Sequence, residues 1–275
     1  MNADRLQLQR LELKYHVNEA QALAVRDFVR SYLELDEYGV GRPNLSYRIH
    51  SLYLDSDDLK TYWDTINGNK NRFKLRLRYY DEEPTSPVFF EVKRRMDNAI
   101  LKQRGGVRRV AVPWLLAGQL PEPDFLLSNQ PKHLVALQRF SQLMLSIGAR
   151  PKAHVAYLRE AWMNHDDNSV RVTMDRDVRV AFEPSSRLST VIEDYVLPFG
   201  EKVILELKFT GRFPNWFRDL VQGFGLIRGS AAKYADGVER IGEEVFKYHS
   251  RAEGEETGDA KSPEYTMDAT GRNLA

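Results

Sequence analysis

The sequence predicts an α+β fold: a closed antiparallel β-barrel with helices packed around it. The first observation is that about nine segments alternate polar and apolar residues, the pattern of a strand with one solvated face. The second is that helical patterns fall between these strands without the strict alternation of strand and helix that marks a parallel sheet. About nine strands in one domain favour closure into a barrel.

The predicted strands follow one another along the chain, with helical segments inserted between them. They cover residues 6–15, 47–55, 72–80, 88–95, 106–112, 153–162, 170–175, 178–182 and 203–209.

A first helix is expected after Asn18. Gln21 follows three residues later, as in a capping box, so each residue can hydrogen-bond the other's backbone. Apolar residues from Val25 to Tyr32 then recur at helical spacing. We expect this stripe to lie in the core.

Residues 57–66 have the same helical spacing, with Trp63 and Ile66 in the apolar stripe, and we expect this stripe in the core as well. Three longer helical patterns follow. They cover residues 131–147, 214–224 and 230–246.

Composition restricts the class of protein. The 275 residues can form one large β-rich domain, and 42% hydrophobic content suffices for a core. The N-terminus is too charged for a signal peptide, and no apolar run approaches the roughly 20 residues that cross a bilayer. The absence of cysteine excludes disulfides, thiolate metal sites and cysteine nucleophiles. We therefore expect a cytoplasmic protein without a membrane span, and a membrane partner stays open.

The last residues differ from the rest in charge. Residues 250–275 contain six acids and three bases and almost no large aliphatic side chain. Such a segment cannot bury enough apolar surface to order itself. We predict one domain over residues 1–249 and a disordered acidic tail over residues 250–275.

Charged residues recur two positions apart within the predicted strands. Because side chains two apart on a strand share a face, each strand has its charges on one side and its apolar residues on the other. The sets are Lys74, Arg76 and Arg78; Glu91 and Lys93; Glu206 and Lys208; Glu12 and Lys14; Lys102 and Arg104; Tyr157 and Arg159; and Arg171, Thr173 and Asp175. A face composed mainly of Arg and Lys is suited to a polyanion.

Two explanations of the charged faces are open. The ordinary one is a half-solvated sheet whose charges pair across neighbouring strands. The repetition favours a barrel with a polar interior instead. The four acids on these faces then offer the hard oxygen ligands that Mn²⁺ or Mg²⁺ prefers, unless each merely neutralises a neighbouring base. They are Glu12, Glu91, Asp175 and Glu206.

Several standard site motifs are missing. The sequence has no G-x-x-x-x-G-K-[ST], no G-x-G-x-x-G, no H-E-x-x-H and no nucleophile elbow. None of the six histidines lies at metal-ligand spacing from another, so each is expected to be an isolated structural residue. Gly105 and Gly106 are expected to form a turn, with a mobile anion-binding loop as the alternative.

Seven short motifs occur in the order found in the VTC domain, which the chain resembles from about residue 11 to residue 237. That domain is the catalytic part of the vacuolar transporter chaperone polyphosphate polymerases, a branch of the triphosphate tunnel metalloenzymes. The motifs are E-x-K-Y at residues 12–15, S-L-Y-L-D-S at 51–56, K-L-R-L-R-Y at 74–79, F-F-E-V-K at 89–93, Y-L-R at 157–159, L-E-L-K at 205–208 and S-A-A-K-Y-A-D-G at 230–237.

The resemblance implies an eight-stranded antiparallel tunnel in which bases hold the phosphates and an acid holds Mn²⁺ or Mg²⁺. The catalytic residues that it implies are Lys14, Arg76, Arg78, Lys93, Arg159 and Lys233. It also implies a metal ligand at Glu206 and further substrate contacts from Lys102 and Arg104. From the strand pattern we add Lys74 and Lys208 as substrate contacts, and Glu12, Glu91 and Asp175 as metal ligands.

The expected function is a metal-dependent transfer of the terminal phosphate of ATP to inorganic polyphosphate. Related hydrolases and cyclases carry E-x-E-x-K, whereas this chain has only Glu12-Leu13-Lys14, which favours the polymerase. The regions that sense phosphate or span the membrane in eukaryotic polymerases are missing, so a free-standing enzyme and one that needs partners are both open.

Two alternatives remain at this stage. One is hydrolysis of inorganic triphosphate or a nucleoside triphosphate in the same tunnel, and the other is a non-catalytic polyphosphate-binding module. Nucleic acid is not expected, because the bases lie beside acids without a stacking motif.

Overall fold

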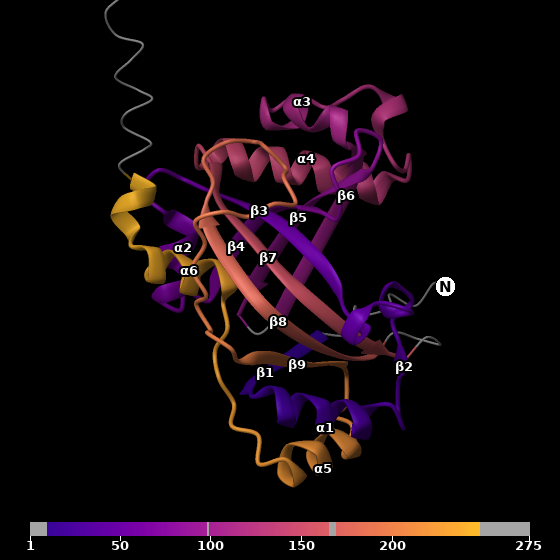
Figure 1. Ribbon diagram of the computed structural model, residues 1–275. Coiled ribbons are helices and arrows are strands. Elements are labelled where there is room, and N and C mark those ends of the chain that lie inside the picture. Colours follow the sequence, from indigo (N-terminus) through magenta and orange to yellow (C-terminus); the bar gives the residue numbers. More distant parts are fainter. Residues whose placement is uncertain (1–9, 98, 165–168, 248–275) are drawn as a thin grey trace, which may run out of the picture.

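The computed structural model describes residues 10–97, 99–164 and 169–247 (Figure 1). The predicted acidic tail and the first residues of the first predicted strand lie outside this part of the chain.

The centre of the molecule is one curled antiparallel sheet. Its strands follow the order β1-β9-β8-β7-β3-β4-β5-β6, and a short strand, β2, pairs with β7. The bounds are β1 Arg10–Val17, β2 Glu34–Leu35, β3 Tyr47–Asp55, β4 Asn71–Tyr79, β5 Pro87–Met96, β6 Ala99–Arg108, β7 Arg150–Met163, β8 Val170–Phe182 and β9 Val203–Thr210. The α+β class and the antiparallel sheet are thereby confirmed.

Closure of the sheet into a barrel is not confirmed. The path ends at β1 and β6, and within the described residues no hydrogen-bonded ladder joins these two strands. They nevertheless come close to each other in space. The sheet is therefore strongly curled, with a seam between its two edges.

The strand predicted over residues 106–112 is wrong in position. The observed strand, β6, begins seven residues earlier, at Ala99, and ends at Arg108. Residues 109–111 then form a turn of 3-10 helix before helix α3, Val112–Leu116. Gly105 and Gly106 lie inside β6, so they form neither a turn nor a loop. A Cβ at Gly105 would lie 2.4 Å from Cγ of Leu137, which explains the glycine: helix α4 packs directly on the strand there.

The two strands predicted over residues 170–175 and 178–182 form one strand, β8. Its pairing with β7 shifts register between Ala156 and Leu158, and Asp177 has a φ of 49°. This irregularity is a β-bulge, which bends a strand without ending it.

Helices cover the convex side of the sheet and one end of its concave side (Figure 1). Helix α4 packs on β5 and β6, α1 packs on β9, and α6 packs on β7 and β8. The bounds are α1 Glu19–Val29, α2 Lys60–Ile66, α4 Pro131–Ser146, α5 Asn215–Gly223 and α6 Lys233–Ile241. In the described part of the chain, no helix is both long enough and apolar enough to cross a membrane.

Two predicted helices are shorter than expected. The helix predicted from residue 57 begins at Lys60, because the Asp55 carboxylate accepts hydrogen bonds from the backbone N–H groups of Thr61 and Tyr62. The helix predicted over residues 230–246 begins at Lys233 and is interrupted at Gly242, where φ is 103°, and residues 243–247 are helical again.

The capping box at Asn18 and Gln21 is confirmed, with the side chain of Asn18 accepting a 2.8 Å hydrogen bond from Gln21 N. The two apolar stripes are core only in part, because Tyr32, Trp63 and Ile66 are exposed. Tyr32 instead stacks on Trp216 at 4.7 Å between ring centroids.

The apolar alternates of the strands form the core on the convex side. Leu75 and Leu77 of β4 pack under α4, and Leu205 and Leu207 of β9 pack against α1 and α5. The charged alternates of the same strands consequently point to the concave side. The functional site is therefore expected on the concave side of the sheet.

The expectation that all histidines are isolated is wrong for two of them. His50 of β3 and His154 of β7 lie on the convex side with Nδ1 and Nε2 3.0 Å apart, and both are buried. The Tyr79 hydroxyl lies 3.1 Å from His154 Nε2 and donates to the carbonyl of Ser189. Burial lowers the pKa of His50 to about 3 and that of His154 to about 4.

We expect this pair to make the fold acid-sensitive. Both folded pKa values lie below the ordinary value of 6.5, so the pair has no effect on stability above pH 6.5 and lowers it as the pH falls from 6.5 toward 4. The slope is about 1.4 kcal/mol per pH unit for each histidine. Urea unfolding at pH 7, 6 and 5 measures it. A His50→Asn variant with the same slope as the wild type would contradict the assignment.

Candidate functional site

A cavity of about 1430 Å³ lies on the concave side of the sheet. It is lined by twelve of the predicted site residues: Glu12, Lys14, Lys74, Arg76, Arg78, Lys93, Lys102, Arg104, Arg159, Glu206, Lys208 and Lys233. The other two, Glu91 and Asp175, are fully buried behind this lining. The structure thus brings the predicted residues around one space.

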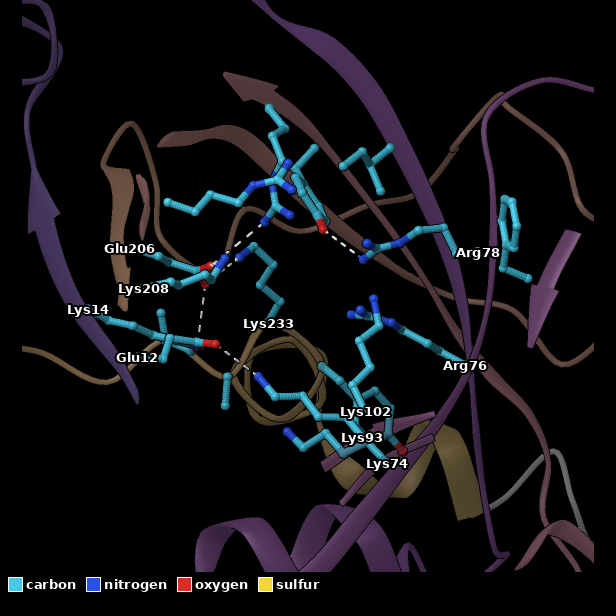
Figure 2. A pocket seen from close by; sticks show the side chains of 18 of the residues that line it. Glu12, Lys14, Lys74, Arg76, Arg78, Lys93, Lys102, Glu206, Lys208 and Lys233 are labelled. Carbon is cyan, nitrogen blue, oxygen red and sulfur yellow. Dashed lines mark hydrogen bonds and ion pairs between the residues drawn. The ribbon is translucent and has the colours of Figure 1, made fainter. Parts of the chain in front are cut away.

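The site has two facing walls (Figure 2). Glu12 and Lys14 of β1 and Glu206 and Lys208 of β9 form the first wall. Strands β4, β5 and β6 form the second, on which Lys74, Lys93 and Lys102 lie together and Arg76 and Arg78 follow along β4.

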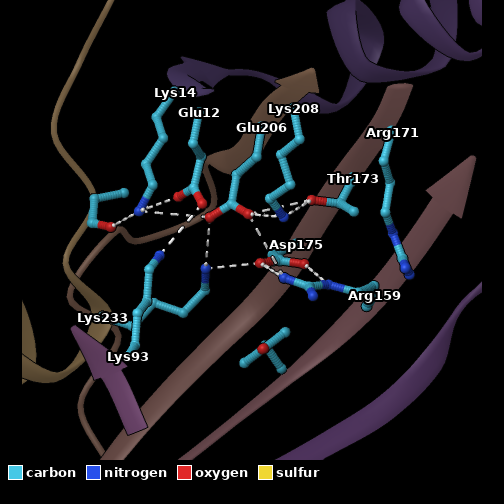
Figure 3. Close-up of polar contacts among 12 residues, drawn as sticks. Glu12, Lys14, Lys93, Arg159, Arg171, Thr173, Asp175, Glu206, Lys208 and Lys233 are labelled. Carbon is cyan, nitrogen blue, oxygen red and sulfur yellow. Dashed lines mark hydrogen bonds and ion pairs between the residues drawn. The ribbon is translucent and has the colours of Figure 1, made fainter. Parts of the chain in front are cut away.

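Glu206 is the centre of the first wall (Figure 3). Its carboxylate lies 2.5 Å from Lys208 Nζ, 3.5 Å from Lys14 Nζ and 3.6 Å from Lys233 Nζ. Burial alone would raise the pKa of Glu206, but these cations outweigh it and hold the pKa well below its usual range. Glu206 is therefore ionised at neutral pH.

Asp175 of β8 holds two cations beside Glu206. It accepts two hydrogen bonds of 2.7 Å from Arg159 and lies 2.7 Å from Lys233 Nζ. Burial acts to raise the pKa of Asp175, yet Arg159 and Lys233 lower it to about 2. Asp175 thus positions the two bases, with Lys233 presented at the start of α6.

Glu12 links the edge strand β1 to β5, the neighbour of the other edge strand, β6. Its carboxylate lies 3.3 Å from Lys14 Nζ and 3.2 Å from Lys93 Nζ, and Lys93 comes from β5 across the seam. Burial and Glu206 act to raise the pKa of Glu12, but Lys93, Lys208 and Lys14 lower it to about 2.

Glu91 is the buried acid of the second wall. It lies 2.7 Å from Arg76, 2.6 Å from Arg104 and 2.9 Å from Lys102. Glu91 therefore lies on the opposite wall from Glu206, and the four predicted metal ligands do not form one cluster. Burial lowers the pKa of Lys102 to about 6, with Arg76 and Arg104 acting in the same direction.

Among the predicted site residues of the second wall, two cations have no carboxylate within ion-pair distance in the described part of the chain: Arg78 and Lys74. Arg78 is buried and donates to the Tyr157 hydroxyl at 3.0 Å, while its Nε has no hydrogen-bond partner there. Burial lowers the pKa of Lys74 to about 8. A buried charge without an acid is unfavourable unless an anion supplies the missing partner.

The acids of the first wall provide only part of the ligands that a metal ion requires. Within residues 10–97, 99–164 and 169–247, no group of three acids or histidines can enclose a metal by itself. Glu12 and Glu206 nevertheless both face Lys14 Nζ, and Mg²⁺ commonly binds one or two carboxylates together with phosphate oxygens. The donor set therefore suits a metal that arrives with phosphates. The metal roles of Glu91 and Asp175 stay predictions.

Several residues of the cavity were assigned no site role from the sequence. Tyr53 Oη accepts a hydrogen bond of 3.0 Å from Arg76, and Tyr157 lies under both Arg159 and Lys233. Arg72 and Arg95 also line the cavity. These two arginines could have been found, since they continue the two-residue spacing of Lys74 and Lys93.

A comparison with protein families gives a match over most of the chain. The family model described as VTC domain matches residues 9–241, a range that includes every strand of the cavity. No curated protein matches the chain at a significant level.

Several solved structures are similar to the chain, including the following two. One is a putative adenylate cyclase from Bacillus halodurans, with 11% sequence identity over 85% of this chain and 97% of that chain and a TM-score of 0.46. The other is PH1819 protein from Pyrococcus horikoshii OT3, with 13% identity over 85% of this chain and 99% of that chain and a TM-score of 0.43.

Proposed function

Since the chain belongs to the VTC domain family, we propose that it is a metal-dependent polyphosphate polymerase that transfers the terminal phosphate of ATP to a polyphosphate chain. One observation carries the proposal: two walls of bases face each other across one long cavity, and Arg78 and Lys74 have no acid of their own. A linear row of phosphates would supply the missing negative charge.

In the proposed reaction, a terminal oxygen of the polyphosphate chain attacks the γ-phosphorus of ATP. A new P–O bond forms, the bond from the γ-phosphorus to the β–γ bridging oxygen breaks, and ADP leaves with that oxygen. The chain becomes one phosphate longer. Such a transfer needs positioning and charge neutralisation more than covalent help from the protein.

The bases would divide this work between the walls. Arg76, Arg78 and Arg104 hold phosphate oxygens of the nucleotide from one side, since guanidinium groups bind them in a bidentate manner. Lys14, Lys208 and Lys233 approach from the other side, and Asp175 keeps Lys233 in place. The oxygens of the transferred phosphate are thereby neutralised from two directions.

Glu206 and Glu12 would hold Mn²⁺ or Mg²⁺, which supplies further neutralisation of the phosphate oxygens. The proposal also requires the curled sheet to act as a tunnel, which keeps out bulk water as a competing acceptor. A donor role for ATP requires a compartment that contains ATP, so the proposal places the protein in the cytoplasm.

The products distinguish this function from its alternatives. We expect purified protein with ATP, Mn²⁺ and a short polyphosphate primer to yield ADP and a ladder of phosphate polymers on a gel. Orthophosphate as the sole phosphate product, at every ATP concentration, would establish a triphosphatase instead. Tight binding of polyphosphate without release of ADP would identify a binding module.

A further inference from the structure

The two ends of the cavity carry different side chains. Along β4, the residues Arg72, Lys74, Arg76 and Arg78 line the cavity in steps of two, and Tyr80 follows directly after the strand. Each step of two residues advances the lining by about 6.6 Å. The lining of this wall therefore changes from basic to aromatic along a single strand.

The aromatic end is built by four rings from different segments. Tyr80 lies 6.4 Å from Phe89 of β5, and Tyr38 lies 5.8 Å from Tyr47 of β3, between ring centroids. All four line the cavity, with Tyr80 38% and Tyr38 66% exposed. The Arg104 guanidinium lies 4.4 Å from the Phe89 centroid, so this aromatic end adjoins the proposed phosphate contacts.

The charges of the two ends differ as well. Apart from Glu12 and Glu206, the acids among the described lining residues are Asp36, Glu37 and Asp81, and they adjoin Tyr38 or Tyr80 in the sequence. The other end has Arg72 and Arg95. The acids near the aromatic rings are accompanied by bases, since Arg171 lies 2.7 Å from Asp36 and Arg42 and Arg48 also line the cavity. Arg72 and Arg95 have no carboxylate within ion-pair distance in the described residues, so a long polyanion is favoured at their end.

We infer that the aromatic end, formed by Tyr38, Tyr47, Tyr80 and Phe89, is a nucleoside subsite that stacks the base of the donor nucleotide. The inference rests on the proposed function, because a nucleotide must present its phosphates to the bases of the cavity. In a row of phosphates the nucleoside occupies one end only, and exposed rings provide the flat apolar surface that a base requires. The growing polyphosphate chain then extends toward Arg72 and Arg95.

The test compares two ligands that differ chiefly by the nucleoside. Calorimetry at fixed salt gives Kd for a non-hydrolysable imidotriphosphate analogue of ATP and for inorganic tripolyphosphate. Tyr80→Ala is expected to weaken the ATP analogue about tenfold or more and to leave tripolyphosphate unchanged, because stacking on one ring is lost. Tyr80→Phe keeps the ring and should keep the affinity.

Three further variants test whether the effect is specific to the nucleoside subsite. Tyr38→Ala, at a more exposed ring of the same subsite, should act like Tyr80→Ala. Tyr32→Ala is the matched control, because Tyr32 is exposed and stacks on Trp216 outside the cavity lining. Arg95→Ala should weaken the binding of long polyphosphate and leave the ATP analogue unaffected.

Unchanged affinity of the ATP analogue in both Tyr80→Ala and Tyr38→Ala would overturn the inference, as would an equal loss for ATP and tripolyphosphate. Binding is measured without turnover, so the result is independent of the polymer assay. If no polymer forms while Tyr80→Ala still weakens only the ATP analogue, the proposed polymerase fails and the nucleoside subsite stands.

Discussion

Replacing Glu206 with Gln is expected to abolish metal-dependent phosphate transfer, with kcat falling by about a hundredfold or more. The substitution keeps the volume of the side chain and removes the negative charge that a hard metal ion requires. Glu206 also lies at the centre of the cation cluster around Lys14, Lys208 and Lys233. Release of ADP over a titration of Mn²⁺ or Mg²⁺ measures the effect.

Two measurements make the Glu206 experiment specific. Metal-free tripolyphosphate should still bind to the variant, because Arg78 and Lys74 of the opposite wall are untouched. Glu239→Gln makes the same chemical change at an exposed position of α6 and should turn over like the wild type. Metal-dependent turnover that survives Glu206→Gln would show that Glu206 only neutralises its neighbouring bases.

Replacing Arg78 with Met is expected to weaken tripolyphosphate binding by roughly 10- to 100-fold. A hydrogen bond to a charged group contributes about 1.5–3 kcal/mol, and the guanidinium has no carboxylate competing for it. In the wild type, tripolyphosphate should raise the Tm, and the increase should shrink with added salt. The variant should lose most of this increase.

The fold of the Arg78→Met variant should be at least as stable as that of the wild type in the absence of ligand. The reason is that the substitution removes a buried charge whose Nε has no partner in the described structure. Arg218→Met, at an exposed position of α5, serves as the control and should keep the full response to tripolyphosphate. Normal ligand stabilisation in Arg78→Met would show that Arg78 does not contact phosphate.

The side of the sheet on which each charge lies could be predicted from the sequence. In β4, the alternation of Leu75 and Leu77 with Lys74, Arg76 and Arg78 assigns the two faces, because successive side chains of any strand point in opposite directions. The same local rule placed Glu206 and Lys208 of β9 in the cavity. The Asn18 cap was predictable for a similar reason, since its partner Gln21 is three residues away.

Contacts between distant segments could not be predicted in this way. His50 and His154 are 104 residues apart and meet only because β3 pairs with β7 in one particular register. Gly105 and Gly106 resemble a turn in the sequence, and only the close packing of Leu137 on β6 explains them. The β-bulge that joins the two halves of β8 likewise depends on its pairing with β7.

By itself, the sequence determined an antiparallel α+β fold with charged residues on one face of its strands, because strand periodicity is a local property of the backbone. Only the tertiary structure decided which charges meet. The strand order places Glu91 on one wall and Glu206 on the other, and it leaves Arg78 and Lys74 without an acid within ion-pair distance. These pairings depend on register and curvature over the whole sheet, which bring strands from both ends of the chain around one cavity.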